Sequence, residues 1–258
     1  MWIDTHAHLA GLCENEFLSV LQSAKTAGVG GVINIATDLE ESKIVIEQAK
    51  LQTPVKTFAV IGIAVPESSI FSEMDGWVEK IENLAKNKEV IAIGETGIDF
   101  AGKSDYPPIE KQIAVFEKQI EIAKKLNKPL VVHSRMAEEK VLETVLSAGL
   151  KNVLFHCFTG TAETAKKITD SGFYISFSGI ATFKKSGLEE AVKAVPSDKI
   201  LVETDAPWLA PEPFRGKPNE PAFVKYVGEK VAQIRGIESG KLAEITRINA
   251  EKFFGVQF

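Results

Sequence analysis

The stretch "EKQIAVFEKQIEIAKKLNKPLVVH" (residues 110–133) contains the unit from which the fold can be worked out. Its first part carries apolar residues at Ile113, Phe116, Ile120 and Ala123, close to the spacing of one face of an α-helix. The "PLVVH" that follows is short, apolar on both faces and rich in β-branched residues, which is typical of a buried parallel strand. The stretch therefore predicts an amphipathic helix that leads directly into a strand of an α/β protein.

The same alternation recurs along the whole chain. Further amphipathic stretches are "AEEKVLETVLSAG" (137–149) and "GLEEAVKAVPS" (187–197), which stop at Gly149 and near Pro196. Short apolar runs that read as strands occur at residues 2–4, 31–36, 57–63, 90–93, 129–132, 152–155, 173–177 and 199–202. Strands alternating with helices in this way predict a (β/α)8 TIM barrel that occupies residues 1–258 as a single domain, with a C-terminal helical extension.

A doubly wound sheet is the main alternative architecture. It requires a glycine-rich phosphate loop after an early strand. The glycine-rich "AGVGG" (residues 27–31) instead precedes a predicted strand and is better explained as a helix stop and turn. The barrel is therefore favoured.

Composition restricts the class of protein. The chain has 258 residues, 45% of them hydrophobic and 25% charged, which is ordinary for a globular protein with a sizeable core. A net charge of −5 gives no support to a broad basic face for nucleic acid. Two cysteines are too few for a disulfide framework, and no apolar run approaches the ~20 residues of a membrane span. We expect a cytoplasmic protein with no membrane partner, and a monomer by default.

The polar residues at the predicted strand ends point to a site. The chain has four histidines, and all of them (His6, His8, His133 and His156) follow predicted strands, as do Glu95 and Asp205. The C-terminal strand ends of a barrel meet at one mouth, where chemistry collects. His6 and His8 also have the i, i+2 spacing that directs two side chains to one face of a strand. Each residue has a structural alternative, such as a hydrogen-bonded core histidine or a turn-capping carboxylate, but their joint placement on one rim favours function.

Imidazoles combined with carboxylates are a metal-ligand set. Zn²⁺, Mn²⁺ and Fe²⁺ suit mixed nitrogen and oxygen donors, whereas Mg²⁺ prefers more oxygen. The set is larger than the four ligands of a structural zinc site, which favours two divalent ions (Zn, Mn or Mg) that share a carboxylate and a water. Glu95 is the candidate bridge. Asp205 is a candidate metal ligand and acceptor of the water's proton.

The motifs together resemble the TatD-type deoxyribonuclease family of metal-dependent barrel hydrolases. The resemblance rests on "DTHAHL" (4–9), "GETGIDF" (94–100), Gln112, Phe116, Gln119, Ile120, "KPLVVHSR" (128–135), "FHCFTG" (155–160), "YISFSG" (174–179), "ETDAPWLAP" (203–211) and "RGKPNEP" (215–221). It implies two divalent metals bound by His6, His8, Glu95, His133, His156 and Asp205. It also implies phosphodiester cleavage of DNA, of the 3'-5' exonuclease type.

The chain departs from the family pattern in two places. Members commonly carry a histidine in a "GxHP" stretch after the third strand, where this chain reads Gly62-Ile63-Ala64-Val65-Pro66. Members also often have an aspartate close behind the "HSR" motif, where Met136 stands here. Both departures concern substrate handling and leave the candidate metal ligands intact.

Several residues are candidates for substrate contacts. Arg135 is suited to a bidentate clamp on phosphate, with a surface salt bridge as its alternative. Arg215 and Lys217 of the long loop after the last strand could hold an adjacent phosphate, although a solvated charge is the better reading of Lys217. Trp208 is a candidate ligand contact, and Phe100, Phe158 and Phe183 could complete an aromatic rim, with core packing favoured for Phe158.

Some further residues have mainly structural interpretations. Lys184 and Lys185 are expected to be the solvated face of a helix start. Asn219 and Glu220 are expected to cap the last crossover helix.

Two other functions stay open at this point. A hydrolase of an amide, ester or lactone could use the same metals, but related barrels of that kind often carry a carboxylated lysine where this chain has Glu95. A non-catalytic scaffold would have no chemical need for the full ligand set.

Overall fold

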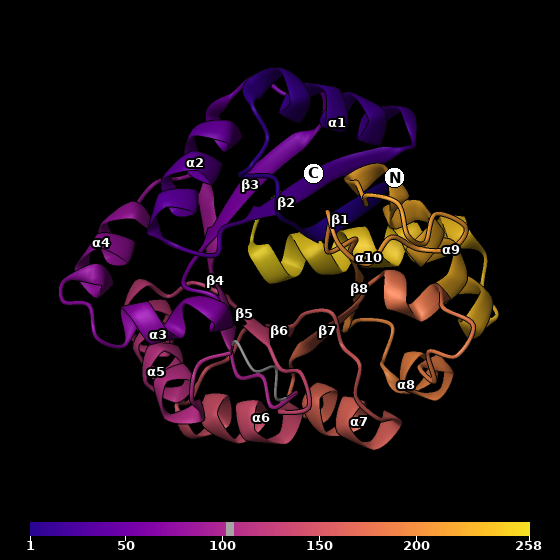
Figure 1. Cartoon of the computed structure of the whole chain (residues 1–258). Helices are drawn as coiled ribbons and strands as arrows, with labels where there is room; N and C mark the ends of the chain where they lie inside the picture. Colours follow the sequence, from indigo (N-terminus) through magenta and orange to yellow (C-terminus); the bar gives the residue numbers. More distant parts are fainter. Residues whose placement is uncertain (102–105) are drawn as a thin grey trace.

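A computed structural model describes residues 1–101 and 106–258. In the described part the strands form one parallel eight-stranded sheet in the order of the sequence, wrapped into a barrel (Figure 1). The strands are β1 (Trp2–Ala7), β2 (Val29–Ile35), β3 (Lys56–Ile61), β4 (Val90–Gly97), β5 (Leu130–His133), β6 (Val153–Phe155), β7 (Tyr174–Phe177) and β8 (Ile200–Val202). The predicted barrel and all of its predicted strands are confirmed.

The strand ends differ from the prediction at three places that matter. β1 runs on to Ala7, β4 to Gly97 and β5 to His133, so His6, Glu95 and His133 lie inside their strands and not beyond them. β1 and β4 are fully buried, and the strand register shifts around these polar residues, between Asp4 and Ala7 on β1 and between Ile93 and Thr96 on β4. A strand predicted from its apolar run therefore ends too early where polar residues begin.

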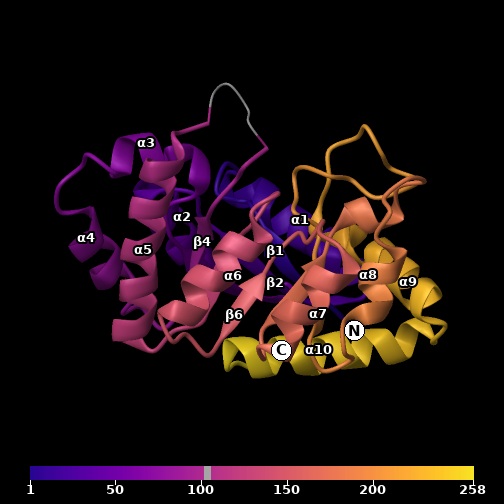
Figure 2. The same ribbon diagram turned by 90° about the horizontal axis from the view of Figure 1, so that it is seen from below.

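Helices surround the barrel on its outer side, as Figures 1 and 2 show. They are α1 (Glu14–Thr26), α2 (Leu39–Lys50), η1 (Val65–Glu67), α3 (Ser68–Phe71), α4 (Trp77–Leu84), α5 (Ile109–Leu126), α6 (Glu138–Ser147), α7 (Ala162–Asp170), η2 (Gly179–Thr182), α8 (Glu189–Ala194), η3 (Pro221–Phe223), α9 (Val224–Arg235) and α10 (Ser239–Phe254). α5 is the helix predicted from residues 110–128, and it ends at Asn127 in the left-handed conformation. The turn predicted at residues 27–31 contains Gly28, with φ +85, just before β2.

The barrel interior is apolar, and α10 closes its lower end. Ile33, Val60, Val131, Leu154 and Leu201 fill the inside together with Phe253 and Phe254 from the end of α10. The Asn249 side chain of α10 donates to the Ile200 carbonyl (2.9 Å). Figure 2 shows α10 running across the face opposite to the loops that follow the strands. This helix is the predicted C-terminal extension, and it leaves only the opposite mouth open.

The long loop after β8 is fastened to the barrel. Asn219 donates from Nδ2 to the carbonyls of Thr204 (2.9 Å) and Trp208 (2.6 Å). Glu220 is the N-cap residue of η3, as predicted, whereas Asn219 precedes the cap and its Oδ1 accepts from the Glu220 N–H (3.0 Å). The Glu220 side chain makes no capping hydrogen bond where η3 begins, and Asn219 braces the loop. No helix in the described ranges is long and apolar enough to cross a membrane.

Candidate metal centre

The candidate ligands converge at the C-terminal mouth of the barrel. They come from β1, β4, β5 and the segments directly after β6 and β8, and most of them line a pocket of about 610 Å³. Asp205 reaches the site because β8 and β1 meet beside it. The Asp205 N–H donates to the His6 carbonyl (2.9 Å), the His8 N–H donates to the Ala206 carbonyl (2.7 Å), and Ala7 forms a parallel bridge with Ala206. The closure of the barrel thus puts the first and last ligands side by side.

One half of the centre consists of His6, His8 and Asp205. The Nε2 atoms of His6 and His8 lie 3.0 Å apart, as the i, i+2 spacing predicts. Asp205 Oδ1 lies 3.9 Å from His6 Nε2 and 3.6 Å from His8 Nε2. These donor atoms all lie within 4.8 Å of one another, which is compatible with a shared divalent ion. We call this group the β1/β8 half.

The other half consists of His133 and His156 and is called the β5/β6 half. His133 Nδ1 lies 3.1 Å from Glu95 Oε1, and His156 Nε2 lies 3.2 Å from the same oxygen. The second carboxylate oxygen, Glu95 Oε2, lies 3.4 Å from His6 Nε2 and 3.5 Å from His8 Nε2. Each oxygen of Glu95 therefore faces one half, which is the arrangement expected of a bridging carboxylate.

Two carboxylates that sequence reasoning missed stand behind the β5/β6 half. Asp99 Oδ2 lies 2.9 Å from His133 Nε2, and Glu203 Oε1 lies 3.2 Å from His156 Nδ1. The Ser176 hydroxyl donates to the other Glu203 oxygen. Such partners fix the orientation of a ligating imidazole and raise its basicity. The sequence held a signal for both, because Asp99 belongs to "GETGIDF" and Glu203 stands two residues before Asp205.

The β1/β8 half has no such support. Among the described residues, the buried Nδ1 atoms of His6 and His8 have no hydrogen-bond partner. A third missed carboxylate, Asp4, acts on the backbone of this half. Its Oδ1 accepts the N–H groups of His6 (3.3 Å) and Thr204 (2.8 Å), and its Oδ2 accepts the Thr204 hydroxyl (2.6 Å). Asp4 thus ties β1 to the residues after β8, and burial raises its pKa to about 8.

Two buried glutamines of α5 hold the loops around the centre. Gln119 accepts from the Ile63 N–H (2.8 Å) and donates to the Ile63 carbonyl (2.8 Å) and the Thr96 hydroxyl (2.6 Å). Gln112 accepts from the N–H of Asp99 (2.9 Å). These contacts give a physical reason for the "Q…F..QI" pattern of the helix. Its two glutamines hold Asp99 and the segment directly after β3 in place.

The charges of the centre are strongly coupled. Burial by itself would raise the pKa of Glu95, but His156 and hydrogen bonds to His133, His156 and His6 lower it well below its usual value. Burial also opposes protonation of His156, yet Glu95 and Glu203 raise the pKa of that ring well above its usual value. The pKa of His6 is lowered by burial, and the charge of His156 acts in the same direction. Burial also opposes protonation of His8, yet Asp205 and Glu95 raise its pKa, so in metal-free protein His6 is the imidazole that least favours a proton.

The candidate substrate residues occupy different places. Arg135 is exposed and lines the pocket, and Trp208, which is 55% exposed, lies edge-on to His8 with ring centroids 5.0 Å apart. Arg215 lies outside the pocket lining, with its guanidinium 4.2 Å from the centroid of the Phe183 ring. Phe158 is buried, as core packing predicts, and Phe100 is 40% exposed.

The pocket wall at the missing family histidine is apolar. Ala64, Val65 and Pro66 line the pocket there.

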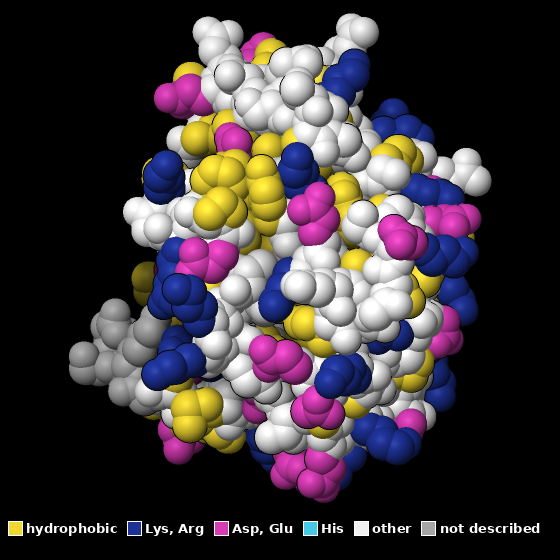
Figure 3. All heavy atoms as spheres, turned by 90° about the vertical axis from the view of Figure 1, so that its right-hand side faces the viewer, with side chains coloured by type: hydrophobic (Ala, Val, Ile, Leu, Met, Phe, Trp, Pro, Cys, Tyr) yellow, Lys and Arg dark blue, Asp and Glu magenta, His cyan; other side chains and the backbone are white. Residues whose placement is uncertain are grey.

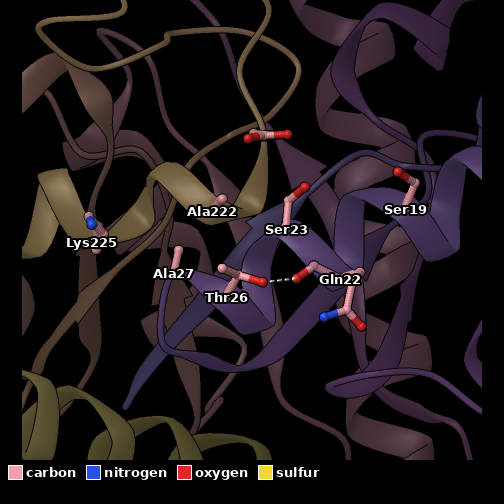
Figure 4. A pocket seen from close by; sticks show the side chains of 8 residues that line it. Ser19, Gln22, Ser23, Thr26, Ala27, Ala222 and Lys225 are labelled. Carbon is pink, nitrogen blue, oxygen red and sulfur yellow. Dashed lines mark hydrogen bonds between the residues drawn. The ribbon is translucent and has the colours of Figure 1, made fainter.

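A second hollow, of about 550 Å³, lies between α1 and the start of α9 (Figure 4). It is lined by residues such as Ser23 and Lys225, and by Thr26, whose hydroxyl donates to the Gln22 carbonyl (3.0 Å). None of the candidate site residues borders it.

A parallel (β/α)8 barrel with imidazoles and carboxylates gathered at its mouth defines the class of metal-dependent barrel hydrolases. Comparison with known proteins leads to the family. Residues 3–255 match the family model described as TatD related DNase. The chain belongs to this family.

Two relatives and one solved structure are similar to the chain over nearly their whole length. A Bacillus subtilis protein named as the uncharacterized metal-dependent hydrolase YabD is 36% identical over 261 residues, covering 99% of this chain and 100% of the relative. The 3'-5' ssDNA/RNA exonuclease TatD of Escherichia fergusonii is 34% identical over 248 residues, covering 93% of each. The crystal structure of YjjV, a TatD homolog from Escherichia coli, superposes with a TM-score of 0.90 at 26% identity, covering 99% of this chain and 98% of that one.

Proposed function

We propose that this chain is a hydrolase of phosphodiester bonds that removes nucleotides from the 3' end of single-stranded DNA, and of RNA as well, with two divalent ions held at the barrel mouth. The observation that carries the proposal is the position of Glu95, whose Oε2 faces His6 and His8 while its Oε1 faces His133 and His156. The exonuclease named among the relatives supports the substrate class.

The chain's own residues divide the work as follows. His6, His8 and Asp205 would hold one ion, His133 and His156 the other, and Glu95 both. Ions bound there would supply Lewis acidity toward a phosphoryl oxygen and lower the pKa of a water molecule. Asp205, at the pocket side of the β1/β8 half, would accept the proton that this water releases.

Substrate orientation would fall to the pocket walls. Arg135, which is exposed and lines the pocket, has planar N–H donors that match two oxygens of a phosphate. Trp208 presents an exposed indole beside His8, where a terminal base can stack without readout of sequence. The apolar wall at Ala64 and Val65 would contact the sugar or base and carries no charge.

The hydrolysis of an amide, ester or lactone on the same centre is the second candidate. A panel of bis(p-nitrophenyl) phosphate, aryl ester, lactone and amide substrates, assayed with Mg²⁺, Mn²⁺ and Zn²⁺, separates the two. We expect turnover of the phosphodiester and progressive loss of a 3'-end label from single-stranded DNA. Turnover confined to the ester, lactone or amide would contradict the proposal.

We also propose that the whole chain acts as one domain, as a monomer in the cytoplasm. The thiols support a reducing compartment, because Cys13 and Cys157 are both free. Size-exclusion chromatography with light scattering tests the monomer, and a dimer mass would contradict it.

A further inference from the structure

Four basic side chains beyond the pocket wall have no acidic partner among the residues that the structure describes. Lys184, Lys185, Arg215 and Lys217 are exposed, and none forms an ion pair within the described ranges. Many exposed lysines on the outer helices are paired, for example Lys193 with Glu190 (2.7 Å). Lys184 and Lys185 were expected at a helix start, but they lie in the loop between η2 and α8. We call these four residues the basic patch.

The guanidinium of Arg215, in the basic patch, lies over an aromatic ring. Its guanidinium carbon lies 4.2 Å from the centroid of the half-buried Phe183 ring. A guanidinium stacked on an aromatic face keeps its N–H edge free, and that edge fits two oxygens of a phosphate. Because Arg215 occupies the Phe183 face, this place offers charge to a nucleic acid and no surface for stacking a base.

The loop that carries Arg215 is braced on both sides. The Glu212 N–H donates to the Thr182 hydroxyl (2.9 Å). Phe214 stacks on Phe223 with centroids 4.2 Å apart and an interplanar angle of 6°. A Cβ atom placed on Gly179 would lie 1.8 Å from the Leu209 carbonyl oxygen, so η2 and the loop are in close backbone contact. The backbone that carries Arg215 is therefore positioned before any ligand arrives, which lowers the entropic cost of binding.

The basic patch begins where the pocket ends. Ile180 and Leu209 line the pocket, and the Phe183 N–H donates to the Ile180 carbonyl (3.0 Å). Three residues of a 3-10 helix advance by roughly 6 Å, so Phe183 lies one short turn beyond the pocket wall. Figure 3 views the barrel from the side of α8 and α9 and shows lysine and arginine side chains along both margins, with acidic side chains among them.

We infer that the basic patch binds the backbone phosphates of a single-stranded polynucleotide that extends away from the metal centre. The inference rests on the proposed function. The chain carries a net charge of −5, so the cations that attract the strand are local to this place. Each cation that neutralises a phosphate releases counterions, and affinity for a long strand consequently falls as salt rises.

Binding without turnover tests the inference independently of catalysis. Fluorescence anisotropy with a labelled oligothymidylate of ten nucleotides, in EDTA, measures Kd as a function of salt. Arg215→Ala is expected to raise Kd about tenfold, and each cation removed lowers the salt slope by about 0.7, the value for single strands. Lys184→Ala/Lys185→Ala should act in the same direction, and Arg215→Lys should fall between wild type and Arg215→Ala.

The matched control is Lys252→Ala, which removes one exposed positive charge from α10 at the opposite end of the barrel. It should leave Kd and the salt slope at wild-type values, and circular dichroism checks that every variant is folded. Phe183→Leu keeps the apolar contact and removes the aromatic face, so it should weaken binding through Arg215 alone. Equal Kd values for wild type, Arg215→Ala and the double lysine variant would overturn the inference, as would equal losses in Lys252→Ala. Because turnover plays no part, failure of the inference is distinguishable from failure of the proposed hydrolysis.

Discussion

The two halves of the candidate centre are built differently around the same glutamate. In the β5/β6 half each imidazole has a carboxylate behind it, Asp99 for His133 and Glu203 for His156. In the β1/β8 half the Nδ1 atoms of His6 and His8 lack any partner among the described residues, and a carboxylate, Asp205, stands among the candidate ligands instead. The imidazoles of the β5/β6 half are oriented by carboxylates that contact their second ring nitrogens. The β1/β8 half is instead held in place through the backbone of β1 and its contacts with the residues after β8.

This difference predicts that the halves can be disturbed one at a time. Substitution of Asp99 or Glu203 should weaken metal binding by the β5/β6 half and leave metal binding by the β1/β8 half unchanged. Glu95 is the exception, because its two oxygens belong to opposite halves.

The largest effect is expected from Glu95→Ala. Removing the shared carboxylate deprives both halves of a donor and leaves no bridge between them. We expect loss of detectable hydrolysis of bis(p-nitrophenyl) phosphate, together with less than one bound ion per chain by elemental analysis. A variant that keeps both ions and its activity would show that Glu95 is not shared.

Next come the single-half variants His6→Ala and His133→Ala. Each removes a donor from one half only, so each should retain about one ion per chain while hydrolysis falls by orders of magnitude. Circular dichroism and metal analysis on the same samples check folding and occupancy. Full activity in His6→Ala with unchanged metal content would exclude His6 from the mechanism.

Smaller effects are expected from the residues behind the rings. Glu203→Gln keeps an acceptor for His156 and loses its charge, while Glu203→Ala loses both. Metal affinity of the β5/β6 half should fall by about 10- to 100-fold, with the alanine variant worse. Asp99→Asn should act likewise through His133.

Titration calorimetry with Mn²⁺ measures these losses, and Asp198→Asn, at an exposed acid, is the control. If Glu203→Ala weakened both halves equally, the distinction between them would be lost.

The smallest effect is a pH dependence of the metal-free protein. The pKa of His156 is raised above its ordinary value of 6.5 by Glu95 and Glu203, against the effect of burial. The protonated His156 ring contributes to the free energy of unfolding. That contribution is fully present below pH 6.5 and is lost as the pH rises through the raised pKa of the ring. Asp4, with its pKa raised by burial to about 8, changes stability in the same direction.

The thermal midpoint of metal-free protein should therefore fall as pH rises from 6.5 toward 9, and less steeply in His156→Gln. Metal affinity should rise over the same range, because the ions displace protons. A midpoint independent of pH would contradict the assigned direction.

The sequence predicted what is local and repetitive. Buried strands such as β5 and amphipathic helices such as α5 carry their own periodicity, and the ligands follow from their place at strand ends. Asp99, Glu203 and Asp4 were missed because their roles depend on partners distant in the sequence. Glu203 contacts a ring 47 positions away, and Asp4 pairs with Thr204, 200 positions away. The place of Asp99 in "GETGIDF" and of Glu203 two residues before Asp205 marks both as candidates, but only the folded barrel shows which ring each carboxylate contacts.

The loops after the strands were the least predictable part. Arg215 was expected to face an adjacent phosphate, and only the structure shows that it stacks on Phe183 outside the pocket lining. Asn219 resembled a helix cap but fastens the loop, because its amide reaches two carbonyls that the chain reversal brings near. Side-chain geometry of this kind depends on tertiary contacts, and sequence spacing does not encode it.

The most direct test is crystallography of the protein grown with Mn²⁺, with anomalous scattering recorded to locate the ions. The account predicts two anomalous peaks, one beside His6, His8 and Asp205 and the other beside His133 and His156, with one oxygen of Glu95 directed at each. A single peak held by both oxygens of Glu95, or two peaks that leave Glu95 unbound, would contradict it.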